Sequence, residues 1–447
     1  MDARGIAAWA GPAAAGLVAL AMSLAFIRTG TWSEFDEYTH FDYVVKVGAG
    51  LSLPPVNDLL GQTAIQTAVC GAAPGFGVFA QACGAAIIDP TRMPYAGAST
   101  ATGYLPTYYL ATGLGARVIE ALPGDASWID SARLMGALYL VIAALLVVAI
   151  ARRLDAGTLV AVSAGVAMAA MPMVLQQFST VNNDSLAIVL SLAAVYAYLR
   201  LGESSWARRS TVAFGLAFLA LTVKETAIVS VAAVAALSLS DGLAFEEKRR
   251  WAVLARSEAR AGLAAGFVVT AAGVLRYVAY PAVVGQVADN GLQEKAIIAL
   301  QGTPPVNLVA GNALNASMSV FEVPQGTLSG VWFSVAAQAL ALAALGLPLA
   351  ALLRVSRLRE LRSPREVLAL VVVCAVPVFI IGFLAALRLI DVPPLFQPRY
   401  LLPVMVLGIA VAASHISRQW WRVTLPLSAV FAGIVFISLS TSPQWSG

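Results

Sequence analysis

Charged residues are scarce in this chain. Asp, Glu, Lys and Arg make up 12% of its 447 residues, whereas about a quarter is usual for a soluble domain. Apolar residues make up 59%, and the mean hydropathy is +0.80. Long apolar runs recur along the whole length. This composition excludes an ordinary soluble domain and is typical of a polytopic helical membrane protein.

Nucleotide-binding motifs are also missing. The sequence has neither a dinucleotide-binding fingerprint nor a P-loop, and the loops expected on the inner side are too short for a soluble nucleotide-binding domain. It has no low-complexity tract and no internal sequence repeat. We therefore expect no nucleotide substrate from the cytosol and no nucleic-acid partner. The basic clusters instead indicate membrane topology beside anionic lipid.

The apolar runs predict a single all-α membrane domain, residues 1–447, with about eleven spans. We place these spans near 9–28, 129–150, 156–175, 184–200, 209–223, 226–240, 261–280, 329–353, 367–387, 400–416 and 423–440. Most of the 28 Lys and Arg residues fall in short loops on the side of the N-terminus, so the positive-inside rule predicts an N-terminus inside. The first span is interpreted as a signal anchor. Two long segments, 29–128 and 281–328, are then outside loops.

Cysteine and histidine are rare. Cys374 lies in a predicted span and is expected to be a small apolar filler. Cys70 and Cys83 lie in the outside loop 29–128. A disulfide between them is expected in an oxidising compartment, where it would stabilise the loop by about 3 kcal/mol. With two histidines in the chain, no Cys/His metal pattern exists.

An acidic stretch, residues 33–43, follows the first span. On a helix, Asp36, His40 and Tyr43 share one face and Glu37 sits at its edge. A carboxylate here could take a proton from an attacking hydroxyl. Asp36, Glu37 and His40 could also hold a divalent ion such as Mg²⁺ or Mn²⁺. The alternative is that the acids only stabilise the first turn of a helix.

The rest of the first outside loop carries two surface-helix patterns. Amphipathic spacing from Tyr38 to Val45 predicts a helix that lies along the membrane surface. Later, an aromatic segment with Tyr104 and Tyr108 leads into an apolar helix that ends near Leu122. Because Tyr favours the headgroup layer, this second helix is predicted to be interfacial.

Cationic residues lie at the outer ends of several predicted spans. The guanidinium of Arg399 suits phosphate oxygens and could hold a lipid-linked phosphate. Lys224 could do similar work, and Arg388 and Arg276 are weaker candidates. The alternatives are a snorkelling anchor role for Arg399 and, for Lys224, a solvated or locally paired edge, since Glu225 is its neighbour.

Three polar residues, Asn182, Asn183 and Asp184, open the span predicted at 184–200. They suit a helix N-cap, and capping alone would explain them. They could also hydrogen-bond sugar hydroxyls.

Taken in order, these motifs resemble the GT-C class of membrane glycosyltransferases, and within it a group of predicted bacterial membrane proteins without assigned function. The resemblance rests on Asp36-Glu37-x-x-His40, Tyr104-Leu-Pro-Thr-Tyr108-Tyr109, Arg133, Asn182-Asn183-Asp184, Lys224, and Arg399-Tyr400 with Pro403. The order holds over nearly the whole chain. Two departures affect the active-site motifs: Phe35 replaces a Pro before Asp36, and Pro106-Thr107 replaces a double Pro.

The resemblance implies a GT-C-like fold in a bacterial cytoplasmic membrane. It also implies an inverting glycosyltransferase that moves a sugar from a polyprenyl-phosphate donor to an envelope glycan or lipid acceptor on the extracytoplasmic face. Asp36 would be the base on the acceptor hydroxyl, with Glu37 and His40 orienting it or holding a metal. Arg399, helped by Lys224, would bind the donor phosphate, and the prenyl tail would lie in an apolar groove between spans. The residues expected to contact substrate are His40, Tyr104, Tyr108, Asn182, Asn183, Asp184 and Tyr400.

Other functions stay open at this point. A ligase or polymerase that moves a whole lipid-linked glycan would use a similar site. A transporter or lipid flippase would be expected to show inverted repeats or charged residues in mid-membrane, and the sequence shows neither pattern. A non-catalytic scaffold needs no acidic cluster. The sequence does not identify the sugar or the acceptor.

Overall fold

The computed structural model of this chain is helical, apart from one isolated bridge between Leu59 and Ala98, in the part of the chain that it describes. That part comprises residues 3–30, 32, 37–50, 52–71, 88–93, 97–123, 126–202, 204–246, 254–285, 287, 343–353, 363–389 and 398–441. Nearly all of the predicted outside loop 281–328 lies outside these ranges.

The described residues of the predicted membrane spans are almost all helical. The helices are α1 (Ala3–Arg28), α5 (Trp128–Arg153), α6 (Thr158–Ala170), α7 (Pro172–Ser179), α8 (Asp184–Arg200), α9 (Trp206–Val223), α10 (Ile228–Glu246), α11 (Leu254–Val274), the helix Ala343–Leu353, α16 (Pro364–Leu389), α17 (Leu402–His415) and α18 (Trp421–Thr441). The π-helix η6 (Leu275–Ala279) joins α11 to α12 (Tyr280–Val284). Short 3₁₀ turns include η5 (Glu225–Ala227), η8 (Pro398–Leu401) and η9 (Arg418–Trp420).

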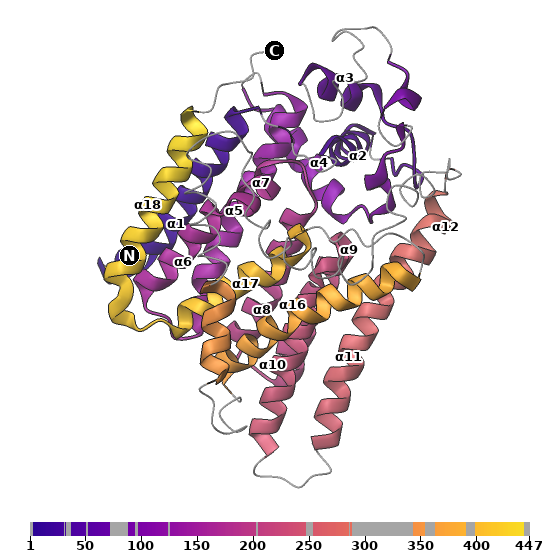
Figure 1. The fold of residues 1–447 in the computed structure, drawn as a ribbon. Helices are drawn as coiled ribbons and strands as arrows, with labels where there is room; N and C mark the ends of the chain where they lie inside the picture. The colour runs from indigo at the N-terminus through magenta and orange to yellow at the C-terminus, as the bar shows by residue number, and fades with distance from the viewer. Residues whose placement is uncertain are drawn as a thin grey trace.

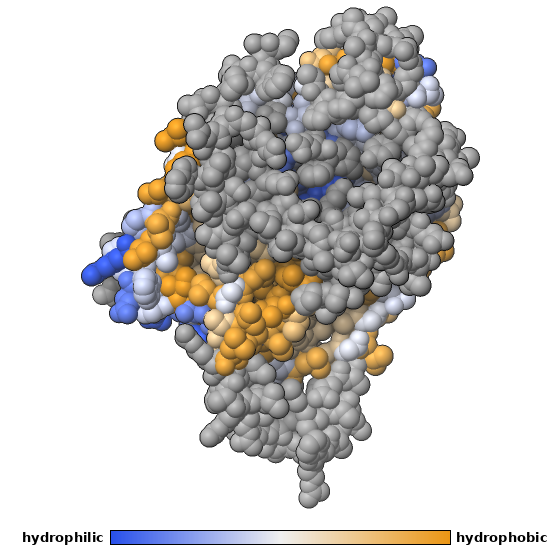
Figure 2. All heavy atoms as spheres, viewed as in Figure 1, coloured by the Kyte–Doolittle hydropathy of each residue, from blue (hydrophilic) through white to orange (hydrophobic). Residues whose placement is uncertain are grey.

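Four described helical segments are long and apolar enough to cross a membrane: Ala10–Arg28, Trp128–Arg153, Arg260–Val284 and Arg418–Ile437. The bent pair α6 and α7 would make a fifth. Other bundle helices are shorter, such as α8 with 17 residues, whereas a span needs about 20. The chain is thus an all-helical protein with four or five candidate membrane spans among its described residues. Apolar side chains cover the middle of the face seen in Figure 2.

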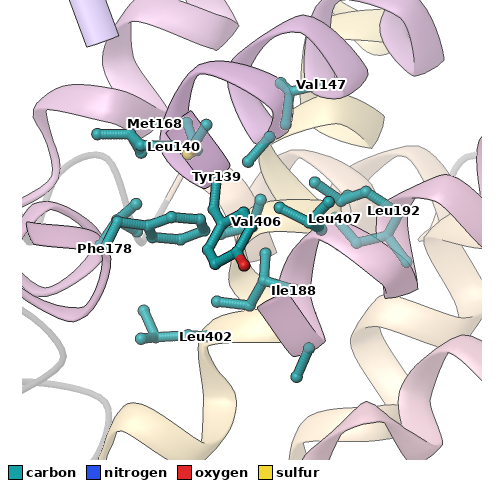
Figure 3. Packing of buried hydrophobic residues seen from close by; sticks show 14 of the residues in the cluster. Tyr139, Leu140, Val147, Met168, Phe178, Ile188, Leu192, Leu402, Val406 and Leu407 are labelled. Atoms are coloured by element: carbon teal, nitrogen blue, oxygen red, sulfur yellow. The ribbon is translucent and has the colours of Figure 1, made fainter. Parts of the chain in front are cut away.

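Helix α5 is the centre of the bundle. Ser127 caps its first turn by accepting a hydrogen bond from the Asp130 amide, and Arg152 and Arg153 complement the helix dipole at its last turn. It packs against α1, α4, α6, α8 and α17. Figure 3 shows the resulting core, in which side chains of α5, α7, α8 and α17 interdigitate. Between membrane helices, close packing of this kind supplies much of the stabilisation.

A glycine sets how closely α5 approaches its neighbour α7. A Cβ on Gly136 would lie 2.0 Å from the Phe178 carbonyl oxygen. A larger residue at this position would push the end of α7 away. The backbone of residues 178–180 therefore sits where only glycine on α5 permits it.

The span predicted at 156–175 is broken, which corrects the sequence interpretation. α6 ends at Ala170, Met171 is extended, and Pro172 begins α7 at an angle of 66° to α6. Proline fits the first position of a helix because it lacks an amide hydrogen. The break directs α7 toward the residues that open α8.

The first outside loop forms a compact group of helices: α2 (Glu37–Gly50), α3 (Gln62–Cys70), η2 (Pro90–Arg92), η4 (Thr100–Gly103) and α4 (Thr107–Glu120). Figure 1 shows α2, α3 and α4 together at the upper end of the bundle, with α2 seen nearly along its axis. The prediction that α2 lies along the membrane surface is wrong. Its residues 37–44 are all buried, because α3, η4, α4 and α5 pack around it.

Helix α4 fits the interfacial prediction better. One face packs on α2 at a close crossing of Gly113 and Gly48, where a Cβ on Gly113 would lie 3.2 Å from the Gly48 Cα. The opposite face exposes Leu114 and Val118. Exposed apolar side chains at helical spacing are typical of a helix in contact with lipid.

Cys70 ends α3 and is disulfide-bonded. Cys83 lies outside the described residues, so its pairing with Cys70 stays a prediction. Cys374 in α16 is free.

Candidate functional site

Six helix ends meet at one end of the bundle. α2, α4, α5, α8 and η8 begin there, and α9 ends there. These ends bring together buried polar side chains that are far apart in sequence: Glu37, Tyr108, Arg133, Asp184, Lys224 and Arg399. Basic residues such as Arg153 and Arg200 lie at the opposite ends of α5 and α8.

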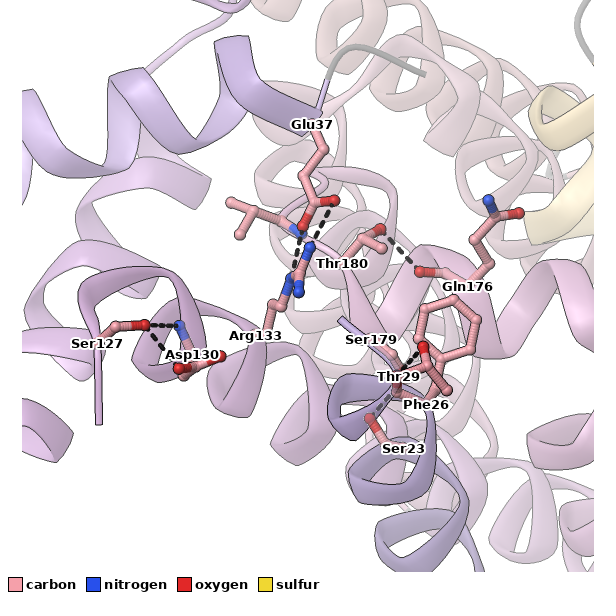
Figure 4. Close-up of polar contacts among 11 residues, drawn as sticks. Ser23, Phe26, Thr29, Glu37, Ser127, Asp130, Arg133, Gln176, Ser179 and Thr180 are labelled. Atoms are coloured by element: carbon pink, nitrogen blue, oxygen red, sulfur yellow. Dashed lines mark hydrogen bonds and ion pairs between the residues drawn. The ribbon is translucent and has the colours of Figure 1, made fainter. Parts of the chain in front are cut away.

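The start of α2 is held by a buried ion pair (Figure 4). Arg133 of α5 donates from Nε and from one terminal nitrogen to the two carboxylate oxygens of Glu37, at 2.9 and 3.1 Å. The Val181 amide donates to Glu37 Oε1 at 3.0 Å. Glu37 is 0% exposed. A bidentate contact of this kind neutralises the carboxylate and fixes its geometry, so Glu37 joins the start of α2 to α5.

Asp36, the predicted base, lies outside the described residues. Its sequence neighbour Glu37 contacts the segment that leads into α8.

Two of the three residues of the possible Mg²⁺ or Mn²⁺ site, Glu37 and His40, have other partners among the described residues. Both oxygens of Glu37 accept from Arg133, whose positive charge opposes a second cation. His40 uses Nδ1 in a 2.8 Å hydrogen bond with the Tyr109 hydroxyl. The parts of the chain that the structure describes hold no group of three His, Cys, Asp or Glu side chains suited to a metal.

A second buried ion pair joins the start of α8 to the link between α9 and α10. Lys224 Nζ lies 2.7 Å from Asp184 Oδ2, and the two side chains are 2% and 1% exposed. The backbone around Asp184 is fixed locally: Asn182 Oδ1 accepts from the Asp184 amide at 2.9 Å, and Asn183 donates to the Val223 carbonyl at 3.2 Å. The three polar residues that open α8 therefore form a capping and ion-pairing unit around Lys224.

Lys224 is buried, so the alternative of a solvated edge is wrong. Glu225 does not compete for it, because Glu225 forms an ion pair with Arg276 instead. Burial lowers the pKa of Lys224, and the charge of Arg399 acts in the same direction, while Asp184 opposes the shift.

Arg399 and Lys224 share one aromatic partner. The Lys224 ammonium lies 5.5 Å from the centroid of the Tyr400 ring, and the Arg399 guanidinium carbon lies 5.8 Å from it. Arg399 is 5% exposed. Two like charges in a buried position repel each other, and the aromatic ring and Asp184 offset part of that cost.

An aromatic cluster surrounds His40. The Tyr109 ring stacks on Tyr43 at a centroid distance of 3.9 Å, and the Tyr104 ring lies 5.9 Å from His40. His40 and Tyr43 thus share the helix face that the sequence indicates. Tyr108 packs edge-on to Tyr109 on the side of Asn182. Burial raises the pKa of Tyr108 and of Tyr109 well above the ordinary value, so both phenols stay neutral.

Several buried polar atoms of the site have no hydrogen-bond partner within the described ranges. They are Asn182 Nδ2, Asn183 Oδ1, Asp184 Oδ1 and Thr226 Oγ1. Buried polar atoms of folded proteins are nearly always paired. Such a group around the Lys224–Asp184 pair is suited to contact a polar ligand.

Sequence reasoning underrated two cations that organise this end. Arg133 appeared there as a family mark without a role, although a charge near the start of an apolar span signals a buried partner. Arg276 was placed among the weaker candidates, yet it pairs with Glu225 and stacks over the Tyr104 ring at 4.3 Å. The Arg388 side chain lies outside what the structure describes.

An apolar cavity of about 440 Å³ lies between α6, α17, α18 and the helix Ala343–Leu353. Its lining includes Val160, near the start of α6, and Ile416, just past the end of α17. These positions belong to the half of the bundle away from the candidate site. This cavity is therefore not adjacent to the Lys224–Asp184 pair.

The fold resembles that of GT-C enzymes. The chain is similar to the crystal structure of the Archaeoglobus fulgidus oligosaccharyltransferase in complex with zinc and sulfate, with a TM-score of 0.50 and 13% identity over 96% of this chain and 53% of that one. The chain thus spans about half the length of that protein. It belongs to the DUF2142 family of predicted membrane proteins, which it matches over residues 84–408.

Weaker similarity extends to ArnT from Cupriavidus metallidurans. The apo structure gives a TM-score of 0.37 at 16% identity, over 90% of this chain and 76% of that one. The structure of ArnT bound to undecaprenyl phosphate gives the same TM-score and identity, over 93% and 77%. No curated protein matches the sequence.

Proposed function

We propose that this protein is a glycosyltransferase that moves a sugar from a polyprenyl-phosphate donor to an envelope glycan or lipid acceptor, with inversion at the anomeric carbon. The GT-C fold supports a lipid-linked donor, although a shared fold does not fix the chemistry. The sugar and the acceptor are left open.

One observation carries the proposal: two buried cations, Lys224 and Arg399, lie near the same aromatic ring, that of Tyr400. Lys224 also pairs with Asp184 at the start of α8. Keeping two cations together in a low-dielectric position costs free energy, which an anionic ligand would recover. The amide dipoles at the start of α8 add positive potential. A phosphate diester has the charge that this position would attract.

The direction of the helices supports an extracytoplasmic site. α5 and α8 begin at the site and end at Arg153 and Arg200. Arg208 lies in the first turn of α9, and Arg418 lies in η9, directly before α18. With basic ends inside, about eleven spans and an inside N-terminus, the site faces the outer side of a bacterial cytoplasmic membrane.

In the proposed reaction, Asp36 accepts the proton of the acceptor hydroxyl as that oxygen forms a bond to the anomeric carbon of the donor sugar. The bond between that carbon and the phosphate oxygen breaks, and the phosphate leaves with the electron pair. Arg399 and Lys224 stabilise the charge that develops on the leaving phosphate. Glu37 and Arg133 hold the start of α2 so that the base stays in place. No step uses a nucleotide.

The test is to identify the lipid that co-purifies with the protein by mass spectrometry, in wild type, Arg399→Ala and Arg418→Ala. Arg418 is an exposed arginine at the basic end and controls for loss of nonspecific phosphate binding. We expect a polyprenyl phosphate or its sugar adduct in wild type and Arg418→Ala, and its loss in Arg399→Ala. The mass of the adduct would separate a single sugar from a whole glycan.

Bulk phospholipid alone in all three samples would refute the donor assignment and favour a transporter or a scaffold. A second test addresses the base: an Asp36→Asn protein that folds and keeps full transfer activity would remove Asp36 from the mechanism.

A further inference from the structure

A second ion pair lies directly beside the proposed donor site. Glu225, the residue after Lys224, forms an ion pair with Arg276 of the π-helix η6. The Arg276 guanidinium carbon lies 4.3 Å from the centroid of the Tyr104 ring and 5.1 Å from that of Tyr277. Single π-helical turns are frequent at functional sites, and this one places a cation and an aromatic ring next to each other.

The group formed by Glu225, Arg276, Tyr104 and Tyr277 has neighbours on two sides. On one side, Tyr104 lies 5.9 Å, ring to ring, from His40 of α2, the helix that begins one residue after the proposed base. On the other side, Glu225 is joined by a peptide bond to Lys224, which pairs with Asp184 and is proposed to bind the donor phosphate. The group thus lies between the two parts of the mechanism that an acceptor hydroxyl must join.

These side chains lie toward the outer end of the candidate span Arg260–Val284, and their exposure differs. The side chains of Lys224 and Asp184 are 2% and 1% exposed, whereas the Glu225 side chain is 52% exposed and Tyr277 is 66% exposed. The Arg276 side chain is 13% exposed, and its Nε is buried without a hydrogen-bond partner among the described residues. A ligand can therefore reach the carboxylate, the guanidinium and an aromatic face together.

The chemistry of the group is that of sugar recognition. A carboxylate accepts and a guanidinium donates hydrogen bonds, so neighbouring hydroxyls of a pyranose can bridge them. The apolar C–H face of the ring can stack on a tyrosine. A phosphate would be repelled by the exposed Glu225, so the group suits a neutral sugar better than an anion.

We propose that Glu225, Arg276 and Tyr277, backed by Tyr104, bind a neutral pyranose of the acceptor. This inference rests on the proposed glycosyltransferase function and assigns its acceptor subsite. The pyranose can belong to a soluble glycan or to a glycolipid, since both present the same hydroxyls.

The competing explanation is a structural latch, meaning that the ion pair between Glu225 and Arg276 only stabilises the fold. The chain contains a matched control for this explanation. At the opposite end of the bundle, Arg209 pairs with Asp241 at 2.9 Å and lies 5.1 Å from the centroid of the Tyr198 ring. This trio has the same composition of arginine, carboxylate and tyrosine. Phe267, on α11 and 74% exposed, is the matching control for Tyr277.

The test uses the purified full chain in a detergent without a sugar headgroup. Saturation-transfer NMR with a panel of neutral methyl pyranosides measures sugar binding, and mass spectrometry of the same samples measures retained polyprenyl phosphate. The variants are Arg276→Gln and Tyr277→Ala, with Arg209→Gln and Phe267→Ala as controls. We expect a neutral pyranoside to bind wild type, with Kd raised about tenfold in the two test variants and unchanged in the controls. Retained polyprenyl phosphate should be the same in all five proteins.

The outcomes separate this inference from the proposed function. No pyranoside binding by wild type, with polyprenyl phosphate still retained, would overturn the acceptor subsite and leave the donor assignment standing. Equal losses in test and control variants would support the latch and overturn the subsite. Loss of polyprenyl phosphate in Tyr277→Ala would assign the group to the donor sugar instead. Tighter binding of octyl than of methyl pyranosides in lipid nanodiscs would identify a glycolipid acceptor, and equal binding a soluble glycan.

Discussion

The ion pair between Glu37 and Arg133 gives the sharpest stability prediction. Both groups are buried, and Glu37 also accepts from the Val181 amide. Arg133→Met would leave the Glu37 carboxylate buried without its cation, and Glu37→Gln would leave the guanidinium without its anion. Breaking a buried pair by removing one partner costs about 3–5 kcal/mol. We expect each single variant to lose that amount of unfolding free energy.

The double variant, Glu37→Gln with Arg133→Met, separates charge from packing. It leaves no buried charge at this position, and an amide can still accept from the Val181 amide. Replacing a buried ion pair with neutral groups of similar volume is often close to neutral, so the double variant should lie within about 1 kcal/mol of wild type. The assay is unfolding in mixed micelles of increasing SDS content, followed by tryptophan fluorescence, since Trp32 stacks on Arg133 at 5.2 Å.

Single variants that each lose less than about 1 kcal/mol would refute the reasoning, because a pair of that strength is typical of solvent-exposed groups. A double variant as unstable as the sum of the singles would also refute it, since the two changes would then be independent. In the predicted case, the double variant would keep its fold, and its transfer activity would report how far the pair positions the base.

Three further predictions follow from single residues. Retention of polyprenyl phosphate should fall as pH rises through the lowered pKa of Lys224, because the ammonium is charged only below that pKa; Lys224→Arg should move this loss to higher pH in the same mass-spectrometric assay. Gly136→Ala should cost about 1–3 kcal/mol in SDS unfolding, because its Cβ would meet the Phe178 carbonyl, whereas Gly433→Ala, with open space around it, should be neutral. Cys70→Ser should lower the unfolding free energy by about 3 kcal/mol, and an unchanged midpoint would show that the disulfide does not constrain the unfolded chain.

The helices could be predicted from the sequence because their signal is local. Long apolar runs and terminal caps locate α5 and α8 within a few residues, since each helix satisfies its own backbone hydrogen bonds. The sequence shows a proline at position 172 but does not show that the helix changes direction there, because a membrane span can also contain a proline without breaking. The prediction of a surface position for α2 failed for a related reason. An amphipathic pattern distinguishes two faces of a helix but does not say whether protein or lipid covers them.

The polar contacts of the site were harder to predict because they join distant parts of the chain. Glu37 and Arg133 are separated by 96 residues, and Asp184 and Lys224 by 40. Adjacency in sequence was also misleading: Glu225 is next to Lys224, which suggests that the two side chains pair with each other, but they do not. Lys224 has an extended backbone, with φ −158° and ψ 140°, and consecutive side chains on extended backbone point to opposite sides. For this reason Lys224 turns to Asp184 and Glu225 to Arg276.

The same extended residue has a consequence for function. One peptide bond joins the side chain proposed to bind the donor phosphate to the carboxylate proposed to bind the acceptor sugar. The backbone at this point continues directly into η5 and α10, so a movement of Lys224 toward a bound phosphate also moves Glu225 relative to Arg276. Ligands that act on one short rigid element change each other's affinity by the same factor. Donor and acceptor binding should therefore be coupled through residues 224 and 225, and the coupling should disappear when Glu225→Gln weakens the contact with Arg276.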